Sequence, residues 1–372
     1  MTHPPVPPIM LDWEMRDRRT AGTLGGSERW VATAGLAVAI ALALAVLLAP
    51  ARAPAATGPR PARFMVGAAV QSYTPPLAGQ LLSDPAECLP TADALFTGAR
   101  TFAFEEPYVD QQGDGHYDLG DPFVDCNQNG RWDGNTLGGG SNAPRYYDHV
   151  ADDVGARAMV VSNDTHTIAV EVVDNEGLFN VYADRIRAQV AADGYHLDDI
   201  EISSTHDESA PDTIGLGGPD GVLSGTDAYF VDYLVTKSAL AIEQAYDNMR
   251  PATIRYAQAQ EPDNLRQCWS QPPFVDDPLM PILQAVGSDG QVIATLASIS
   301  QHVESLGFNP DPVQALWVSS DWVHFFRASL EQQYGGVGIE MAGAVGAVET
   351  PMLYNAPISR TPRDCLGGRR VG

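Results

Sequence analysis

Ala156-Arg-Ala-Met-Val-Val-Ser-Asn-Asp-Thr-His-Thr-Ile-Ala-Val-Glu-Val-Val173 is the stretch that decides the fold class. Two apolar runs flank the polar turn at residues 162–165, and this pattern predicts a β-hairpin. Apolar residues at helical spacing follow over residues 178–193, and a strand containing Ile200 and Ile202 comes next. Strands that alternate with helices in this way are typical of an α/β domain.

The same alternation continues along the chain as far as residue 341. We expect helices at 228–249 and 321–333, and strands at 63–71, 253–257, 292–299 and 337–341. Residues 77–150 are instead rich in Gly, Pro, Asp and Asn, which favours loops. The sequence therefore predicts an α/β domain over residues 63–372, with a mixed β-sheet flanked by helices and a calcium-loop-like insertion.

The charge of the chain restricts its partners. Its 372 residues carry 47 acidic side chains against 22 Lys and Arg, which gives a formal net charge of −25. Such a surface repels the phosphate backbone, so we expect no nucleic-acid partner. An acidic excess suits cation binding, or it serves solubility alone.

The amino-terminal part of the chain resembles an export signal. Residues 31–49 contain no charge, arginines precede them, and Ala-x-Ala sequences follow over residues 49–55. About 20 apolar residues also suffice to span a bilayer, so this segment is also a candidate membrane anchor, although its form favours a cleaved signal. We expect residues 1–62 to be an export signal or membrane anchor plus a linker, and the remainder to be extracytoplasmic. Cleavage and anchoring both stay open.

The chain has four cysteines, namely Cys88, Cys126, Cys268 and Cys365. An exported protein lies in an oxidising environment, so these residues are compatible with up to two disulfides. Four cysteines allow three pairings, and the sequence does not choose among them.

Residues 110–136 contain a repeat with a period of 15. Within each copy, side-chain oxygens fall at positions 1, 3, 5 and 9 of a loop, and a glycine stands at position 6. Ca²⁺ takes six to eight oxygen ligands, and the glycine allows the sharp turn of such a loop. The spacing resembles EF-hand or dockerin-like calcium loops, and a solvated Asp/Asn/Gly loop is the other interpretation. The candidate ligands are Asp110, Gln112, Asp114, Asp118 and Asp121 in the first copy, and Asp125, Asn127, Asn129 and Asp133 in the second.

Two histidines follow predicted strands at the point where each strand ends. His206 comes after the strand with Ile200 and Ile202, and His302 comes after the apolar run at 292–299. Open α/β sheets place ligands beyond the carboxyl ends of their strands. Both histidines have acidic residues close by, so they are candidate ligands of one metal ion.

Several motifs together resemble the amino-terminal domain of the neutral/alkaline (non-lysosomal) ceramidase family. Its opening strand and Thr-Pro-Pro turn are similar to residues 63–76, and its Ala-Arg-Ala strand is similar to residues 156–161. Thr205-His-Asp-Glu-Ser-Ala-Pro211 resembles the family's Thr-His-Thr-His-Ser-Gly-Pro motif. Residues 296–307 resemble its second histidine strand, and Ser319-Ser-Asp321 resembles the Ser-x-Asp that follows.

This resemblance implies a zinc-dependent hydrolase that cleaves the amide (N-acyl) bond of a lipid-like or other small substrate. It makes His206 and His302 two of the zinc ligands. Glu208 stands where the family has a second histidine, and Glu349 and Thr350 stand where it has its catalytic serine, so these three are the candidate catalytic residues. The family's remaining ligands, a Glu and a Tyr, come from further along the chain, so we expect residues 63–372 to be an incomplete domain.

A second function is compatible with the same sequence. A calcium-stabilised extracytoplasmic domain that has lost catalysis and binds a ligand would also keep the loop repeat and the strand pattern. Zinc content separates the two functions, because the second one needs none.

Overall fold

The structure is a computed structural model, and it describes residues 64–88, 96, 98, 100–139, 144–219, 223–260, 277–306 and 314–347. The candidate export segment, Cys268, Cys365, Glu349 and Thr350 lie outside these residues, so the predictions made for them remain predictions. Among the described residues, no helix combines the length and the apolar character needed to cross a bilayer.

The centre of the fold is an eight-stranded mixed sheet, as the sequence predicts. Two pairs of strands are parallel, β4 with β5 and β8 with β10, and the other neighbours in the sheet are antiparallel. In spatial order the strands are β10 (Val337–Ala342), β8 (Val292–Ile299), β7 (Leu279–Gly287), β6 (Arg250–Gln260), β1 (Phe64–Ser72), β3 (Gly155–Ser162), β4 (Thr167–Val173) and β5 (Asp199–Ser204). The short strands β2 (His149–Val150) and β9 (Trp317–Val318) form a separate parallel pair.

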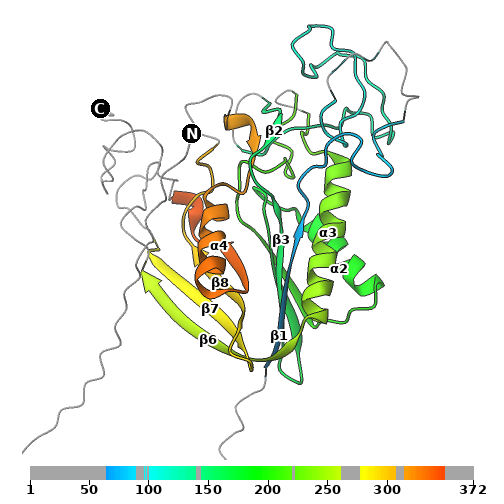
Figure 1. Cartoon of the computed structure of the whole chain (residues 1–372). Coiled ribbons are helices and arrows are strands. Elements are labelled where there is room, and N and C mark those ends of the chain that lie inside the picture. The colour runs from blue at the N-terminus through cyan, green and yellow to red at the C-terminus, as the bar shows by residue number, and fades with distance from the viewer. Residues whose placement is uncertain are drawn as a thin grey trace, which may run out of the picture. The chain divides into compact units, whose positions relative to one another are not determined.

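Helices α2 (Asn180–Ala192) and α3 (Ala228–Asp247) cover one face of strands β1, β3 and β4 (Figure 1). Their apolar faces bury side chains such as Ile186 and Leu234 against Ala158 and Val160 of β3. Helix α3 lies so close to β1 that a Cβ atom on Gly67 would be 2.0 Å from the carbonyl oxygen of Ala245. Glycine is therefore required at this crossing.

Helix α4 (Asp321–Tyr334) lies beside β10 on the other side of the sheet (Figure 1). Two ion pairs join it to strands in the opposite half of the sheet order. Glu331 contacts Arg157 of β3 at 2.5 Å, and the buried Arg327 binds Asp174 at the end of β4. Removing either partner of the Arg327–Asp174 pair would leave an uncompensated buried charge.

The sheet is curled, so that its two halves share a second apolar core. Val66 of β1, Met159 of β3 and Val172 of β4 belong to the same buried cluster as Leu296 of β8 and Ile339 of β10. Strand β10 consequently comes near β5, at the far end of the strand order. This curvature brings the ends of β5 and β8 together, which are six places apart in the sheet.

The sequence missed one strand of the sheet. Strand β7 contains Pro281 and is only partly buried along its first six residues, so neither alternation nor an unbroken apolar run marks it. The helices and the remaining long strands occur where we expected them, with ends shifted by a few residues.

Residues 100–147 form mainly loops, as predicted, and two features hold them together. Tyr108, Tyr117, Trp132 and Tyr146 form a small aromatic cluster, in which the Tyr117 and Trp132 rings stack at a centroid distance of 4.6 Å. A disulfide between Cys88 and Cys126 ties the second loop to the segment before it. The sequence had left this pairing open.

Candidate metal centre

The two histidine motifs lie side by side at the edge where β5 and β8 end. Asp207 and Val303 form a parallel bridge, and the amide of Glu208 donates to the carbonyl oxygen of Val303 at 2.9 Å. The Trp322 indole also donates to the carbonyl oxygen of His302 at 2.8 Å. These bonds fix the backbones of both motifs next to each other.

The backbone of His206 has an uncommon conformation. Its φ angle is +64°, in the left-handed region that non-glycine residues rarely adopt. The bonds on either side maintain it, because the amides of Thr205 and Asp207 donate to the carbonyl oxygens of Val173 and Asn175 at 3.0 and 2.9 Å. Strain of this kind persists only where the surrounding structure determines the conformation, and it is common at functional sites.

The imidazole rings of His206 and His302 approach each other through their Nε2 atoms. Nδ1 of His206 lies 2.8 Å from the carbonyl oxygen of Glu176, and Nδ1 of His302 lies 2.9 Å from that of Val345. A carbonyl oxygen only accepts, so Nδ1 must carry the hydrogen in both neutral rings. Both Nε2 atoms then carry lone pairs, and they are 3.0 Å apart. A cation between these atoms would relieve that contact.

The Glu208 carboxylate completes a group of three candidate ligands. Its Oε1 lies 3.8 Å from Nε2 of His302, and one donor atom from each of the three residues lies within 4.8 Å of the others. Two imidazole nitrogens and one carboxylate oxygen are a donor set found in catalytic zinc sites. The sequence analysis placed Glu208 in a catalytic role, and the structure also makes it a candidate third ligand.

Burial and like charges shift the pKa values at this cluster. Burial raises the pKa of Glu208 to about 7, and the negative charges of Glu304 and Glu176 add to this effect. Burial and the nearby His302 lower the pKa of His206. The lowered pKa disfavours an imidazolium at His206.

Three contributors to the cluster carry no signal in the sequence. Glu176 and Val345 present backbone carbonyl oxygens, which every residue type offers. Arg145 donates from Nη1 to the carbonyl oxygen of Glu208 at 2.7 Å, and it comes from the segment after the loop repeat. Contacts of this kind depend on the three-dimensional course of the chain, so no local pattern predicts them.

The second calcium-type loop has a compact internal arrangement. The side chains of Asn127 and Asn129 each donate to Oδ2 of Asp133 at 2.6 Å. Asp125 accepts from the amides of Asn129 and Gly130 at 2.9 and 2.8 Å. The side chains at positions 3, 5 and 9 thus converge on one point. Asp133 also accepts at 3.0 Å from the amide of Ala228, the first residue of α3.

The first calcium-type loop is more exposed and more acidic. Asp110 accepts from the amides of Gly113 and Gly115 at 2.5 and 2.9 Å. Partial burial and the charges of Asp114 and Asp121 raise the pKa of Asp118. Among the described residues, the acids of this loop do not form a group of three as close as that of His206, Glu208 and His302. Calcium binding by the two loops remains a prediction.

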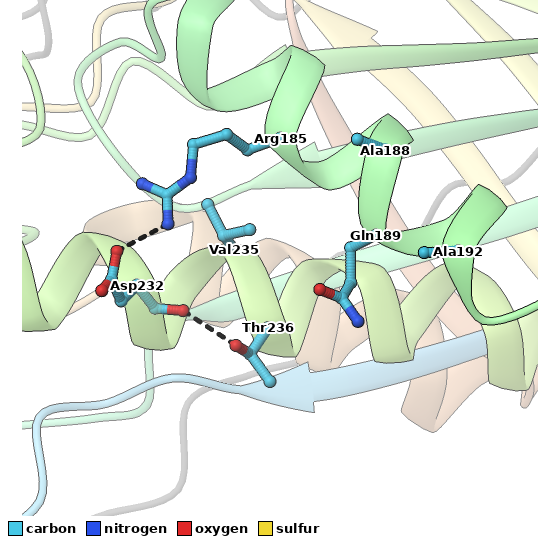
Figure 2. Close-up of a pocket in the computed structure, with 7 residues that line it drawn as sticks. All are labelled: Arg185, Ala188, Gln189, Ala192, Asp232, Val235 and Thr236. Carbon is cyan, nitrogen blue, oxygen red and sulfur yellow. Dashed lines mark hydrogen bonds and ion pairs between the residues drawn. The ribbon is translucent and has the colours of Figure 1, made fainter.

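A surface hollow of about 410 Å³ lies between α2 and α3 (Figure 2). Arg185 and Asp232 form an exposed ion pair across it at 2.6 Å, and Ala188, Ala192 and Val235 are among its lining residues. No histidine or cysteine lines this hollow. The hollow therefore lacks the imidazole ligands that the His206–His302 pair offers.

Comparisons with known proteins support the fold. No family model matches the sequence, and no curated protein matches it. Among solved structures, a ceramidase complexed with C2 superposes with a TM-score of 0.54 at 14% identity, over 78% of this chain and 39% of that one. The neutral ceramidase from Pseudomonas aeruginosa has a TM-score of 0.54 at 12% identity, over 82% of this chain and 42% of that one. The chain spans about two fifths of the length of these neighbours and has a ceramidase-like fold.

Proposed function

We propose that this chain is a zinc-dependent hydrolase that resembles neutral ceramidase and cleaves the amide (N-acyl) bond of a lipid-like substrate. Two independent observations support the proposal. The fold is similar to that of two ceramidases, and His206 and His302, which the sequence resemblance makes zinc ligands, lie close together beside Glu208. The observation that carries most weight is the 3.0 Å distance between the two Nε2 atoms, at rings whose Nδ1 atoms both lie at backbone carbonyl oxygens.

His206, His302 and Glu208 would hold the ion. Zinc bound by such residues polarises a carbonyl oxygen and brings the pKa of a water molecule to about 7. The bonds from the two Nδ1 atoms to Glu176 and Val345 fix the tautomers and hold both rings in orientation. The side chains of His302 and Glu208 are only 13% and 12% exposed, so bulk water has little access to them.

Hydrolysis of a fluorescent long-chain N-acyl amide by the purified full chain tests the activity. We expect turnover that is lost with a chelator and restored by zinc, and a decrease of at least about 100-fold in His206→Ala. His166→Ala is the matched control, because His166 is exposed and its imidazole lies 3.6 Å from the exposed carboxylate of Asp198. Wild-type protein that carries zinc but hydrolyses the amide no faster than His206→Ala would contradict the activity and leave the metal centre standing.

Three further predictions remain proposals. Glu349 and Thr350 are proposed to be catalytic residues, because they stand where the ceramidase family has its catalytic serine. The loops of residues 110–136 are proposed to bind calcium for stability. Residues 31–49 are proposed to direct export, with the folded domain on the extracytoplasmic side.

A further inference from the structure

Residues 136–139 and 144–147, around the end of the loop repeat, lie beside the candidate metal centre. Thr136 and Tyr146 form an antiparallel bridge, and Leu137 pairs both with Arg145, through a backbone bond of 2.8 Å, and with Pro211. The amide of Gly138 donates to the carbonyl oxygen of Ala210 at 2.9 Å. This segment therefore lies alongside the residues that follow His206 and Glu208.

Arg145 joins three separate parts of the chain at this place. Its Nη1 donates to the carbonyl oxygens of Gly138 and Glu208 at 2.8 and 2.7 Å, and its Nη2 donates to that of Ala315 at 2.8 Å. The guanidinium is a rigid planar fork that keeps its charge, and charge-assisted hydrogen bonds are roughly twice as strong as neutral ones. A lysine ammonium carries its three N–H donors on one nitrogen, so it does not reproduce the spacing of the two guanidinium nitrogens.

Gly139 shows how closely this segment approaches the Glu208 side chain. A Cβ atom on Gly139 would lie 2.7 Å from Nη1 of Arg145 and 2.9 Å from Oε2 of Glu208. The backbone there has a φ angle of +90°, which also favours glycine. The amide of Gly139 donates to Oε2 of Glu176 at 2.6 Å, so the segment contacts both carboxylates beside the imidazoles.

We propose that Arg145 is a positioning residue for the metal centre: by binding the Glu208 carbonyl oxygen it holds the backbone that points the Glu208 carboxylate at His302. The inference rests on the proposed function, because it takes Glu208 as a ligand. Residues that hold ligands in place typically affect metal affinity about 10–100-fold when they are changed. Arg145 would act through Glu208 and would not touch the metal or the substrate.

The test compares Arg145→Ala and Arg145→Lys with the wild-type chain, and Arg185→Ala is the control. Arg185 is an exposed arginine whose ion pair with Asp232 lies at the hollow between α2 and α3 (Figure 2). Zinc affinity is measured by competition with a chromophoric chelator. The ligand geometry is measured from the visible absorption of the cobalt-substituted full chain.

We expect Arg145→Ala to bind zinc about 10–100-fold more weakly and to change the cobalt spectrum. Arg145→Lys should lie between it and the wild type, and Arg185→Ala should match the wild type. A loss of stability alone would lower the melting temperature of the metal-free protein without altering the cobalt spectrum of folded molecules. If Arg145→Ala does not fold, Arg145→Lys decides with the same spectrum.

Two results would overturn the inference, and they differ in what else they overturn. A wild-type zinc affinity and cobalt spectrum in both Arg145 variants would remove the positioning role and leave the zinc hydrolase intact. A wild-type chain that binds no zinc would remove the positioning role together with the proposed function.

Discussion

The imidazole cluster (His206, Glu208 and His302) and the two calcium-type loops (residues 110–136) both contain groups that bind metal ions. They differ in the hydrogen bonds that these groups make within the protein. At the cluster, each ring uses Nδ1 on a backbone carbonyl oxygen, which leaves two Nε2 lone pairs opposed at 3.0 Å. In the second loop, Asp133 receives hydrogen bonds from Asn127, Asn129 and Ala228. At the cluster two potential metal ligands approach each other, whereas in the second loop the carboxylate is satisfied by hydrogen-bond donors from the chain itself.

This difference separates two ways in which a metal can serve a protein. Opposed lone pairs repel, so an ion at the cluster adds an interaction that the chain itself does not provide. A loop whose carboxylates accept from its own amides can keep its shape without an ion, and an ion then adds to its stability. Substitutions in the cluster should therefore lower the metal content of the protein, and substitutions in the second loop should lower its free energy of unfolding.

The largest expected effect is the loss of zinc binding in His302→Ala. The variant removes one of two imidazole donors, and we expect the affinity for zinc to fall by more than about 100-fold. Chelator competition measures this value. The melting temperature of the metal-free variant should stay close to that of the wild type, and a large decrease would show that the pair is structural.

Asp133→Ala should have the largest effect on stability. It removes a buried carboxylate that holds the second loop and the start of α3, and it leaves several donors without an acceptor. We expect a loss of about 3–5 kcal/mol in the free energy of unfolding, measured with urea. Asp114→Ala is the control, because its carboxylate is exposed and, among the described residues, accepts one hydrogen bond, from the amide of His116. An equal decrease in the free energy of unfolding in both variants would contradict a special stabilising role of Asp133.

Asp118→Asn tests calcium binding by the first loop through the sign of its effect. Burial and the charges of Asp114, Asp121 and Asp110 raise the pKa of Asp118, so the neutral amide should raise the melting temperature in excess chelator by about 1–2 °C. In calcium the wild type should have the higher melting temperature, because its Asp118 carboxylate is a negatively charged calcium ligand and the amide of the variant is neutral. The same order with and without calcium would contradict a calcium site in this loop.

The smallest expected effect is a change in pH dependence at Glu105, whose neighbour Glu106 accepts hydrogen bonds from the amides of Cys126 and Asp133 in the second loop. Burial raises the pKa of Glu105 from 4.5 to about 8, and its Oε1 has no partner among the described residues. A carboxyl whose pKa is raised in the folded state adds to the free energy of unfolding. The stabilisation is complete below about pH 4.5 and is lost as the pH rises to about 8.

Glu105→Gln should remove this loss. The free energy of unfolding of the wild type relative to the variant should fall by roughly 1–4 kcal/mol between pH 5 and pH 8. Urea denaturation at the two pH values measures the difference. A difference that does not change with pH would show that Glu105 is ionised in the folded protein.

The sequence predicted the part of the site that depends on side-chain type and local pattern. His206 and His302 each follow an apolar run, and the acid at position 208 stands two residues after the first histidine. These signals need only strand periodicity and metal chemistry. The structure adds that the sheet curls, which brings the two strand ends within contact distance.

The parts that the sequence could not supply depend on long-range geometry. The carbonyl oxygens of Glu176 and Val345 orient the rings without any demand on the side chains there. Arg145 reaches Glu208 because the loop segment folds back along residues 208–211. Strand β7 escaped prediction because it is half-exposed and contains Pro281.

Zinc stoichiometry of the purified full chain tests the central claim most directly. After dialysis against metal-free buffer and addition of one equivalent of zinc, elemental analysis should find one tightly held zinc per chain, and His206→Ala should hold none. A wild-type chain that retains no more zinc than His206→Ala would contradict a metal centre at His206, Glu208 and His302.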